Sequence, residues 1–276
     1  MLGLLLLQVL ASCLWLGHSE VVNSFDSCPQ FFYDGIPPND ALNPNNPARI
    51  CQRFRNSYHY ATLYDRDRRI PVYSAYKYEP GPDKRPPGYW LVEPQLIGDN
   101  NLKEMTSEMN LIHNHSFTLD QIKESQAIND DYKGLKDLDC GHLSPSGHQF
   151  TKESKIATFT LTNVVPQDSS LNKGKWMAYE SKIMPKKTQG CTTTYVITGA
   201  VPEKENESSN RVNRPSHIWS AACCLGDEKP KDAWGAIAEN KSKKKVEQLS
   251  LEDLEKRLTE LYGEKVTLFK NACSQK

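Results

Sequence analysis

The chain has 276 residues, which is enough for one large domain or two small ones and for a core of ample size. Its hydrophobic content of 38% and charged content of 25% are typical of a soluble globular protein. Lysine plus arginine and aspartate plus glutamate both total 34, which argues against nucleic-acid binding through a large net charge but leaves room for an enzyme with a local basic patch.

The chain opens with the apolar run "MLGLLLLQVLASCLWLGHSE", which predicts a secretory signal peptide over residues 1–19. The run is short for a membrane span, and Gly17 and Ser19 occupy the −3 and −1 positions of a cleavage site. No positive charge follows Met1, so an uncleaved anchor stays open as the alternative. Since no later stretch is long and apolar enough to cross a bilayer, we expect a secreted protein with no stable membrane span.

The first half of the remaining chain alternates between loops and short regular segments. Residues 34–48 are rich in proline and asparagine, which predicts a loop. Residues 68–78 alternate and are rich in aromatic and β-branched side chains, which predicts a strand. Residues 79–88 form another proline-rich loop, and the polar residues 101–127 are expected to be helical or irregular.

The second half carries three more predicted strands, over residues 155–165, 191–201 and 215–224. Residues 169–184 have helical character, with a serine placed to cap the helix and Pro185 placed to stop it.

The clearest helix is the last one. Ser250 is its cap and Gly263 its end, and the leucines that form one apolar stripe are Leu251, Leu254, Leu258 and Leu261.

Strands and helices mix without regular βαβ alternation, so the pattern predicts the α+β class. We assign residues 20–248 to one domain and treat residues 249–276 as a C-terminal helical segment that packs on the domain or trails from it.

Cysteine usage fits an oxidising compartment. Cys13 would leave with the signal peptide, and an odd number of seven cysteines remains. Three bridges and one free thiol is the simple interpretation, and the sequence leaves fifteen pairings open once the free cysteine is chosen. The expected bridge-forming residues are Cys28, Cys51, Cys191, Cys223, Cys224 and Cys273, with Cys28–Cys51 as the first pair because these two flank one loop-rich segment. The absence of any C-x-x-C pair argues against a zinc knuckle.

Three N-x-[ST] sequons also fit a secreted chain, and they predict glycosylation at Asn114, Asn206 and Asn240. Each of these short motifs also arises by chance.

Asn172, Trp176 and Glu180 are spaced at i, i+4 and i+8 and share one face of a predicted helix. An amide oxygen suits a hard cation and a carboxylate can orient that cation's water, so with His142 as a general base the parts suffice for metal-assisted hydrolysis. On spacing alone, a solvated face with one core aromatic is the more ordinary interpretation.

Two longer segments add a resemblance to this pattern. "DLDCGHLSPSG" (residues 137–147) resembles the D-R-G-H signature of the DNA/RNA non-specific endonucleases, the ββα-metal nucleases. "TFTLTNVVPQDSSLNKGKWMAYE" (residues 158–180) resembles the same family's second block, T-N-x-x-P-Q followed by N-x-G-x-W-x-x-x-E. Further segments resemble secreted vertebrate members of the family, and together the matches cover roughly residues 25–240.

The resemblance implies a ββα-metal fold, in which helices flank a mixed or antiparallel sheet, and it implies roles for individual residues. His142 matches the general base, Asn172 the single protein ligand of Mg²⁺ (with Mn²⁺ as a substitute), and Glu180 the acid that holds a water of the ion. Asn163 matches a second asparagine that supports the site, and the residues that match the frame of the first motif are Asp139 and Gly141.

Two positions depart from the family pattern. The arginine of D-R-G-H is Cys140 here, and the arginine expected before W-x-x-[DE]-P is replaced by Arg85 or Lys84, whose spacing to Trp90 does not match cleanly. A guanidinium grips phosphate with two charge-assisted hydrogen bonds, which a cysteine cannot do. By analogy with lost oxyanion donors, such a loss costs about two to three decades in rate. We therefore expect Cys140 to be the odd thiol and to lie beside the phosphate path.

Three functions remain open at this point. The first is a secreted, Mg²⁺-dependent endonuclease acting on DNA and RNA, slowed by the missing arginine. The second is a non-enzymatic secreted module on a decayed nuclease scaffold, which Cys140 and the zero net charge favour. The third is a disulfide-bonded structural glycoprotein, which would bind neither nucleic acid nor Mg²⁺.

Overall fold

The computed structural model describes residues 20–86, 89–203, 211–227, 229–270 and 272–273. The predicted signal peptide, residues 1–19, and the sequon at Asn206 lie outside the described residues. Among the helices of the described chain, none has the length and apolar character needed to cross a membrane.

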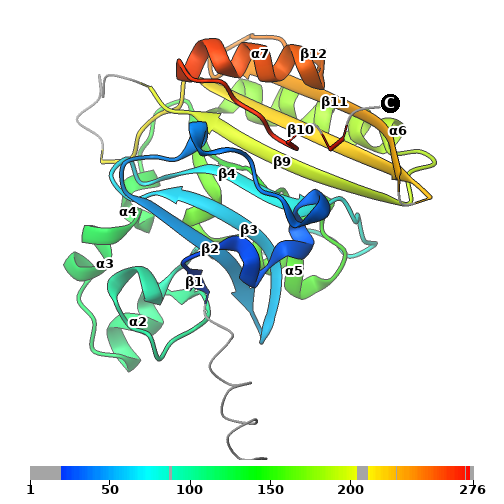
Figure 1. Ribbon diagram of the computed structural model, residues 1–276. Coiled ribbons are helices and arrows are strands. Elements are labelled where there is room, and N and C mark those ends of the chain that lie inside the picture. Colours follow the sequence, from blue (N-terminus) through cyan, green and yellow to red (C-terminus); the bar gives the residue numbers. More distant parts are fainter. Residues whose placement is uncertain (1–19, 87–88, 204–210, 228, 271, 274–276) are drawn as a thin grey trace, which may run out of the picture.

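A large antiparallel sheet forms the centre of the molecule (Figure 1). Its eight strands, counted over the described residues, lie in the order β1 (Val21–Val22), β2 (Pro47–Phe54), β3 (Ser57–Asp65), β4 (Ile70–Lys77), β9 (Thr193–Val201), β10 (His217–Gly226), β11 (Lys229–Glu239) and β12 (Glu247–Ser250). The central strands are buried almost throughout, because both faces of the sheet are covered.

One face packs against the N-terminal turns and the C-terminal helix α7 (Leu251–Tyr262), whose leucines Leu254 and Leu258 join Phe25 and Phe32 in one core cluster. The other face packs against a helix over residues 169–187, which we call the site helix, and Tyr179 and Met184 of that helix contact this side of the core. Figure 1 shows α7 over β10 and β11, with the helix that ends in α6 (Met184–Lys187) behind the sheet.

Shorter elements complete the fold. A two-stranded ribbon joins β7 (Leu138–His142) to β8 (Val164–Asp168), and a second joins β5 (Leu91–Val92) to β6 (Thr106–Ser107). The remaining α-helices are α2 (Glu108–Asn114), α3 (Leu119–Ser125), α4 (Asn129–Tyr132) and α5 (Lys152–Ala157). The 3₁₀ turns are η1 (Phe25–Ser27), η2 (Pro29–Phe31), η3 (Tyr33–Gly35), η4 (Asp40–Leu42), η5 (Pro94–Ile97), η6 (Ser146–His148) and η7 (Leu161–Asn163).

Three disulfides tie the layers together, and they confirm the first predicted pair. The bridges are Cys28–Cys51, Cys191–Cys224 and Cys223–Cys273, while Cys140 is free. Cys223 and Cys224 are neighbours on β10, so their side chains point to opposite faces of the sheet. One bridge therefore fastens the chain's end to the α7 face, and the other fastens the residue before β9 to the site-helix face.

The predicted strands over residues 68–78, 191–201 and 215–224 are confirmed as β4, β9 and β10. The predicted strand over residues 155–165 is wrong, because this segment contains the end of α5, a 3₁₀ turn and only the beginning of β8. Thr151 and Ser154 form a capping box that starts α5 and commits the first part of the segment to a helix.

The site helix also departs from its prediction at both ends. Pro185 does not stop it, because the helix continues from η9 through α6 to Lys187 with helical backbone on both sides of Pro185. Ser170 does not cap it with its side chain. Instead, Asp168 Oδ1 accepts hydrogen bonds from the backbone amides of Ser170 at 3.0 Å and Leu171 at 3.1 Å.

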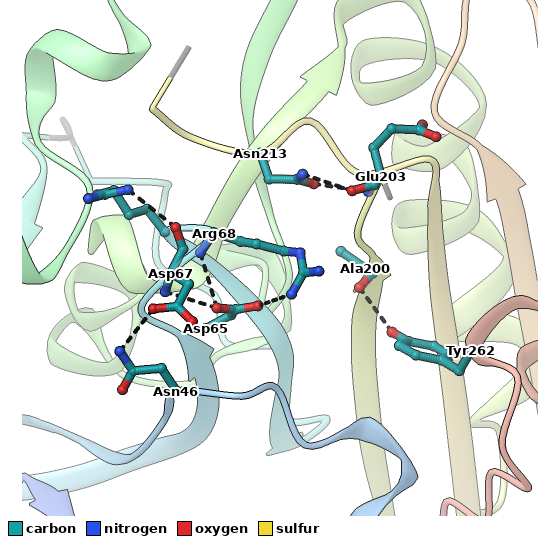
Figure 2. Close-up of polar contacts among 9 residues, drawn as sticks. Asn46, Asp65, Asp67, Arg68, Ala200, Glu203, Asn213 and Tyr262 are labelled. Atoms are coloured by element: carbon teal, nitrogen blue, oxygen red, sulfur yellow. Dashed lines mark hydrogen bonds and ion pairs between the residues drawn. The ribbon is translucent and has the colours of Figure 1, made fainter. Parts of the chain in front are cut away.

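The prediction for α7 is confirmed in detail. Ser250 Oγ accepts from the Asp253 amide at 3.0 Å, and Gly263 ends the helix with a left-handed φ of 80°. Figure 2 shows the last turn of the helix, where the Tyr262 hydroxyl donates to Ala200 O at 3.1 Å. Beside this contact, Asp65 accepts from the amides of Asp67 and Arg68 and so holds the turn between β3 and β4.

Two sequons are described, and they differ. Asn114 is exposed at the end of α2 and remains compatible with glycosylation. Asn240 is only 2% exposed, and its Nδ2 donates to Pro166 O and Pro215 O, both at 2.9 Å. Because both amide hydrogens are used inside the fold, the prediction of glycosylation at Asn240 is wrong.

Candidate active site

A cleft of about 730 Å³ lies between the end of β7 and the site helix. The predicted site residues that line it are His142, Asn172, Glu180, Asp139, Cys140 and Arg85. These residues come from three segments that are separated in sequence, and all of them line this one cleft. Two predicted residues, Asn163 and Gly141, are buried and do not line the cleft.

His142 is the last residue of β7, and its ring is held among aromatic groups. The Trp90 ring centroid lies 5.4 Å from it, and the Phe159 ring meets it edge-on at 5.0 Å. Burial and, second, the nearby Arg85 guanidinium lower the pKa of His142 to about 3. The imidazole is therefore neutral near pH 7, with one of its two ring nitrogens unprotonated.

The two ring nitrogens of His142 differ in accessibility. Nε2 is buried and has no hydrogen-bond partner among the described residues, whereas Nδ1 is open to the cleft. A neutral imidazole carries one donor and one acceptor nitrogen. The geometry leaves Nδ1 as the nitrogen that a water in the cleft can approach.

Asn163 fixes the backbone that follows His142. It is fully buried, its Oδ1 accepts from the Ser144 amide and the Ser74 hydroxyl, and its Nδ2 donates to Ser144 O and Thr158 O, all at 2.9 Å. With its side chain fully hydrogen-bonded, Asn163 holds the backbone at Ser144, two residues after His142.

Asn172 lies in the π-helical turn η8 (Leu171–Trp176) at the start of the site helix. Its Nδ2 donates to Asp139 Oδ2 at 3.1 Å, and within the described chain its Oδ1 makes no hydrogen bond. The hydrogen bond to Asp139 on β7 thus uses the amide nitrogen of Asn172 and leaves its carbonyl oxygen unpaired within the described chain.

Asp139 also holds Lys173, whose Nζ lies 2.8 Å from Oδ1. Burial raises the pKa of Asp139, but hydrogen bonds from Lys173, Asn172 and Ser169 outweigh it and lower the pKa overall. Asp139 is thus an anion that links β7 to the first turn of the site helix.

Glu180 lies in a second π-helical turn, η9 (Tyr179–Ile183). Burial raises its pKa to about 8, although the Trp176 indole and the Arg85 guanidinium lower it in part. A nearby positive charge would stabilise the ionised form of such a half-buried carboxyl. The π-helical turn that carries Glu180 is a kind of turn that occurs often at functional sites.

His148 was missed by the sequence analysis. It is 5% exposed, and its Nδ1 lies 3.0 Å from the Tyr76 hydroxyl, while its Nε2 lies 3.1 Å from the backbone oxygen of Glu180. Burial chiefly lowers its pKa to about 4. His148 therefore fastens the turn carrying Glu180 to β4, a long-range contact that no local sequence pattern signals.

Arg85 lines the cleft, and its guanidinium lies over the Phe159 ring at 5.1 Å from the centroid. Lys84 is exposed and does not line the cleft. Lys155 fastens the loop that carries Arg85, because its buried Nζ donates to Ser146 O at 3.2 Å and to Gly81 O at 3.5 Å. Of the two candidates for a phosphate contact, Arg85 lines the cleft and Lys84 does not.

Cys140 and Gly141 are neighbours in β7 with different surroundings: Cys140 lines the cleft, and Gly141 packs against Gln167. Cys140 shares a strand face with His142, and burial, followed by the charge of Asp139, raises the pKa of its thiol to about 12. It is thus a neutral thiol that lines the cleft. A Cβ on Gly141 would lie 2.1 Å from Gln167 Oε1, so only glycine fits there.

The donor set fits a cation that keeps most of its waters. Within the described residues, no group of three or more histidine, cysteine, aspartate or glutamate side chains could hold a metal. Mg²⁺ accepts one or two protein oxygens and retains water in its other positions. The free carbonyl oxygen of Asn172 and the carboxyl of Glu180 suit this mode of binding.

Comparison with known proteins places this geometry in a family. The family model described as DNA/RNA non-specific endonuclease matches residues 37–263. The endonuclease domain-containing 1 proteins of Mus musculus and Homo sapiens are 34% identical over 258 residues and 32% identical over 260 residues. Each of these alignments covers 91% of this chain and 48% of the relative, so the chain spans about half the length of these relatives.

A more distant relative and one solved structure agree with this placement. The protein named Nuclease EXOG, mitochondrial, of Mus musculus is 28% identical over 151 residues, which is 47% of this chain and 40% of that protein. A crystal structure of the EndoG/EndoGI complex, concerned with the inhibition of EndoG, matches with a TM-score of 0.52 and 18% identity, over 81% of this chain and 87% of that chain. This last likeness concerns the fold.

Proposed function

Since the chain belongs to the DNA/RNA non-specific endonuclease family, we propose that it hydrolyses phosphodiester bonds of DNA and RNA in the cleft beside β7. The observation that carries the proposal is the convergence of His142, Asn172 and Glu180 on one cleft. The chemical state of each residue suits its proposed role. The His142 imidazole is neutral, the Asn172 amide oxygen has no partner among the described residues, and positive charge would stabilise the ionised Glu180 carboxyl.

The chemistry begins with a water in the cleft. His142 accepts a proton from this water through Nδ1, and the water oxygen attacks phosphorus in line with the leaving oxygen. The carboxyl of Glu180 orients water on the opposite wall, while Arg85 and Lys173 offer positive charge to phosphate. A divalent cation such as Mg²⁺, held on Asn172 Oδ1, would stabilise the charge that develops on the phosphate and the leaving oxygen.

The three disulfides support a location in an oxidising compartment, so we infer a secreted enzyme.

A second candidate function is a nucleic-acid-binding module without turnover. It is favoured by one observation, the neutral thiol of Cys140 at the position where the family motif has an arginine.

One assay separates the two functions. Purified protein is incubated with supercoiled plasmid and with RNA, in Mg²⁺ or in EDTA, and the rate of cleavage is measured. The enzyme is expected to cleave in Mg²⁺ and to stop in EDTA, and His142→Ala is expected to lower the rate at least about a hundredfold at an unchanged Tm. His115→Ala, a substitution of an exposed histidine after α2, is the matched control.

A parent protein that does not cleave in Mg²⁺, but whose Tm rises with added nucleic acid, would establish the binding module instead. Cleavage that survives in His142→Ala would contradict the assignment of the base.

A further inference from the structure

A pair of buried carboxyl groups lies outside the cleft, at the beginning of the described chain. Glu20 and Glu93 both have 0% exposure, and the two side chains are within hydrogen-bonding reach of each other. Glu93 Oε1 accepts from Thr160 at 2.8 Å and from Thr162 at 2.7 Å. Apart from the contact between the two carboxyl groups and the Arg53 backbone amide beside Glu20, both carboxyl oxygens of Glu20 and Glu93 Oε2 lack a well-formed hydrogen bond among the described residues.

This arrangement is unfavourable without a compensating group. Burial raises the pKa of Glu20, and the negative charges of Glu93 and Glu104 raise it further, while the Arg53 backbone amide lowers it. No lysine or arginine of the described chain forms an ion pair with Glu20 or Glu93, and the Arg53 side chain is directed to Glu104 and Asn56. Buried carboxylates without a counter-ion are strongly destabilising.

The main-chain nitrogen of Glu20 is buried at the same place. It donates to Gln95 Oε1 at 2.7 Å, and the next amide, that of Val21, donates to the same oxygen at 2.8 Å. Gln95 follows Glu93 by two residues, so one short turn of chain faces both the nitrogen and the carboxyl of Glu20.

Cleavage after Ser19 would change the chemistry of this nitrogen. A neutral amide with one hydrogen would become an α-ammonium group with three hydrogens and a positive charge. One hydrogen keeps the bond to Gln95, and two become available for the carboxyl oxygens that lack partners.

We propose that the α-ammonium of Glu20, created by removal of residues 1–19, is the buried counter-ion of the Glu20–Glu93 carboxyl pair. The mature amino terminus then forms an internal ion pair rather than a solvated end. The proposal stands apart from the nuclease function, because it rests on a separate cluster of groups.

The ion pair is connected to the cleft by a continuous buried chain of hydrogen bonds. From Glu93 the chain passes through Thr162, Gln52 (2.9 Å to Thr162), Thr62 (3.2 Å to Gln52) and Ser74 (3.0 Å to Thr62). Ser74 reaches Asn163, whose side chain holds the backbone next to His142. An uncompensated charge at Glu93 would therefore disturb the groups that position the site.

The first experiment uses the secreted protein with its natural amino terminus. Intact mass and amino-terminal sequencing are expected to place the terminus at Glu20 with an unmodified amine. The folded protein is then treated with an amine-acetylating reagent near pH 7, and the terminal peptide is compared with that from denatured protein. The α-amine is expected to be protected in the folded state, whereas Lys133 and Lys173, with side chains 76% and 71% exposed, are acetylated in both states.

The second experiment moves the ammonium by one residue. A glycine inserted between Ser19 and Glu20 is expected to lower the Tm by at least about 5 °C, because the carboxyl pair loses its counter-ion. A glycine inserted after Gly134, where the chain is exposed and unobstructed, is the control and is expected to leave the Tm unchanged.

Three results would overturn the proposal: a terminus at another residue or a cyclised Glu20, an α-amine that is acetylated in the folded state as fast as the lysines, or an unchanged Tm after the insertion before Glu20. If the extended chain fails to be secreted, the acetylation result on the natural protein still decides.

Discussion

Two helices, α7 and the site helix, cover opposite faces of the sheet. They differ in how closely they follow the usual sequence signals for a helix, which are the cap, the apolar stripe and the terminal glycine. In α7, the cap, the apolar stripe and the terminal glycine all agree with one another. In the site helix, the first turn is capped from the preceding strand, two segments are π-helical and a proline lies inside. The regular helix carries no group of the cleft, whereas the irregular one carries Asn172 and Glu180.

The same contrast appears in the polar groups. Two polar side chains of α7 have partners, Tyr262 on Ala200 O and Glu255 on the Leu268 amide at 2.7 Å, although the Trp219 indole nitrogen in the same core cluster lacks a well-formed hydrogen bond among the described residues. Around the site helix, His142 Nε2 and Asn172 Oδ1 have none among the described residues, and Glu180 is half-buried with a raised pKa. Unsatisfied groups beside a cleft are available for binding or chemistry, at a cost in stability.

The largest expected effect tests the structural side of this comparison. Leu258→Ala on α7 should destabilise the protein by about 3 kcal/mol, because a fully buried side chain leaves a cavity against the sheet. The rate of cleavage per folded molecule should not change. Denaturant unfolding and the plasmid assay measure the two quantities, and Leu261→Ala, at a half-buried position of the same stripe, should cost less. A loss of activity without a loss of stability would show that α7 belongs to the site.

The next effect tests the functional side. Asp139→Ala should lower the rate of cleavage by about ten- to a hundredfold, because Asn172 loses the hydrogen bond that directs its carbonyl oxygen into the cleft. The Tm should fall little, since the ion pair to the exposed Lys173 contributes at most about 1 kcal/mol. Asp130→Ala, which removes an exposed ion pair to Lys133, is the control. Equal rates for both variants would remove Asp139 from the site.

A third effect concerns pH. The pKa of Glu180 is about 8 in the folded protein, above its value of 4.5 in an unfolded chain, so the folded state holds a proton that the unfolded state releases. Its contribution to stability is complete below pH 4.5 and is lost as pH rises through 8. Glu180→Gln cannot ionise, so its Tm relative to the parent should rise by roughly 5 °C between pH 5 and pH 8.

The exposed carboxylate variant Glu260→Gln should follow the parent at every pH. Added Mg²⁺ should raise the Tm of the parent at pH 8 more than that of Glu180→Gln, because a nearby cation favours the ionised carboxyl. Parallel curves for parent and Glu180→Gln would contradict the raised pKa.

The sequence was informative where local rules decide the structure. Strands β4, β9 and β10 were predicted from alternating or continuous apolar runs, and α7 from its cap and stripe. Strands β2 and β3 were not, because their buried polar side chains, such as Gln52 and Thr62, are satisfied only within the tertiary structure. Strand β11 was not predicted either, although its buried residues are apolar. The threonines of residues 158–162 fit a strand pattern and led to the wrong prediction there. In the structure, Thr160 and Thr162 lie in a turn and donate hydrogen bonds to Glu93.

The site shows the same limit. The candidates His142, Asn172 and Glu180 came from motif resemblance, and the structure brings them together in one cleft. His148 and Lys155 support the cleft through long-range contacts to Tyr76, Glu180 and Gly81, so no spacing in the sequence pointed to them. Residues that touch the cleft carry a local signature, whereas residues that hold them in place are defined by the tertiary structure.

The smallest effect tests whether the cleft lacks a phosphate contact. Cys140 lies on the strand face of His142 as a neutral thiol, and an arginine there would be charged at every pH and would remain beside the Asp139 carboxylate. Cys140→Arg should raise the rate of plasmid nicking about tenfold, which corresponds to 1.4 kcal/mol. The gain should shrink as salt rises, because exposed phosphate contacts are screened. Cys140→Met, which adds length without charge, should leave the rate unchanged. A lower rate and a lower Tm in both variants would show that the thiol is needed for packing against its apolar neighbours, and that the loss of the arginine is tied to the fold rather than to catalysis.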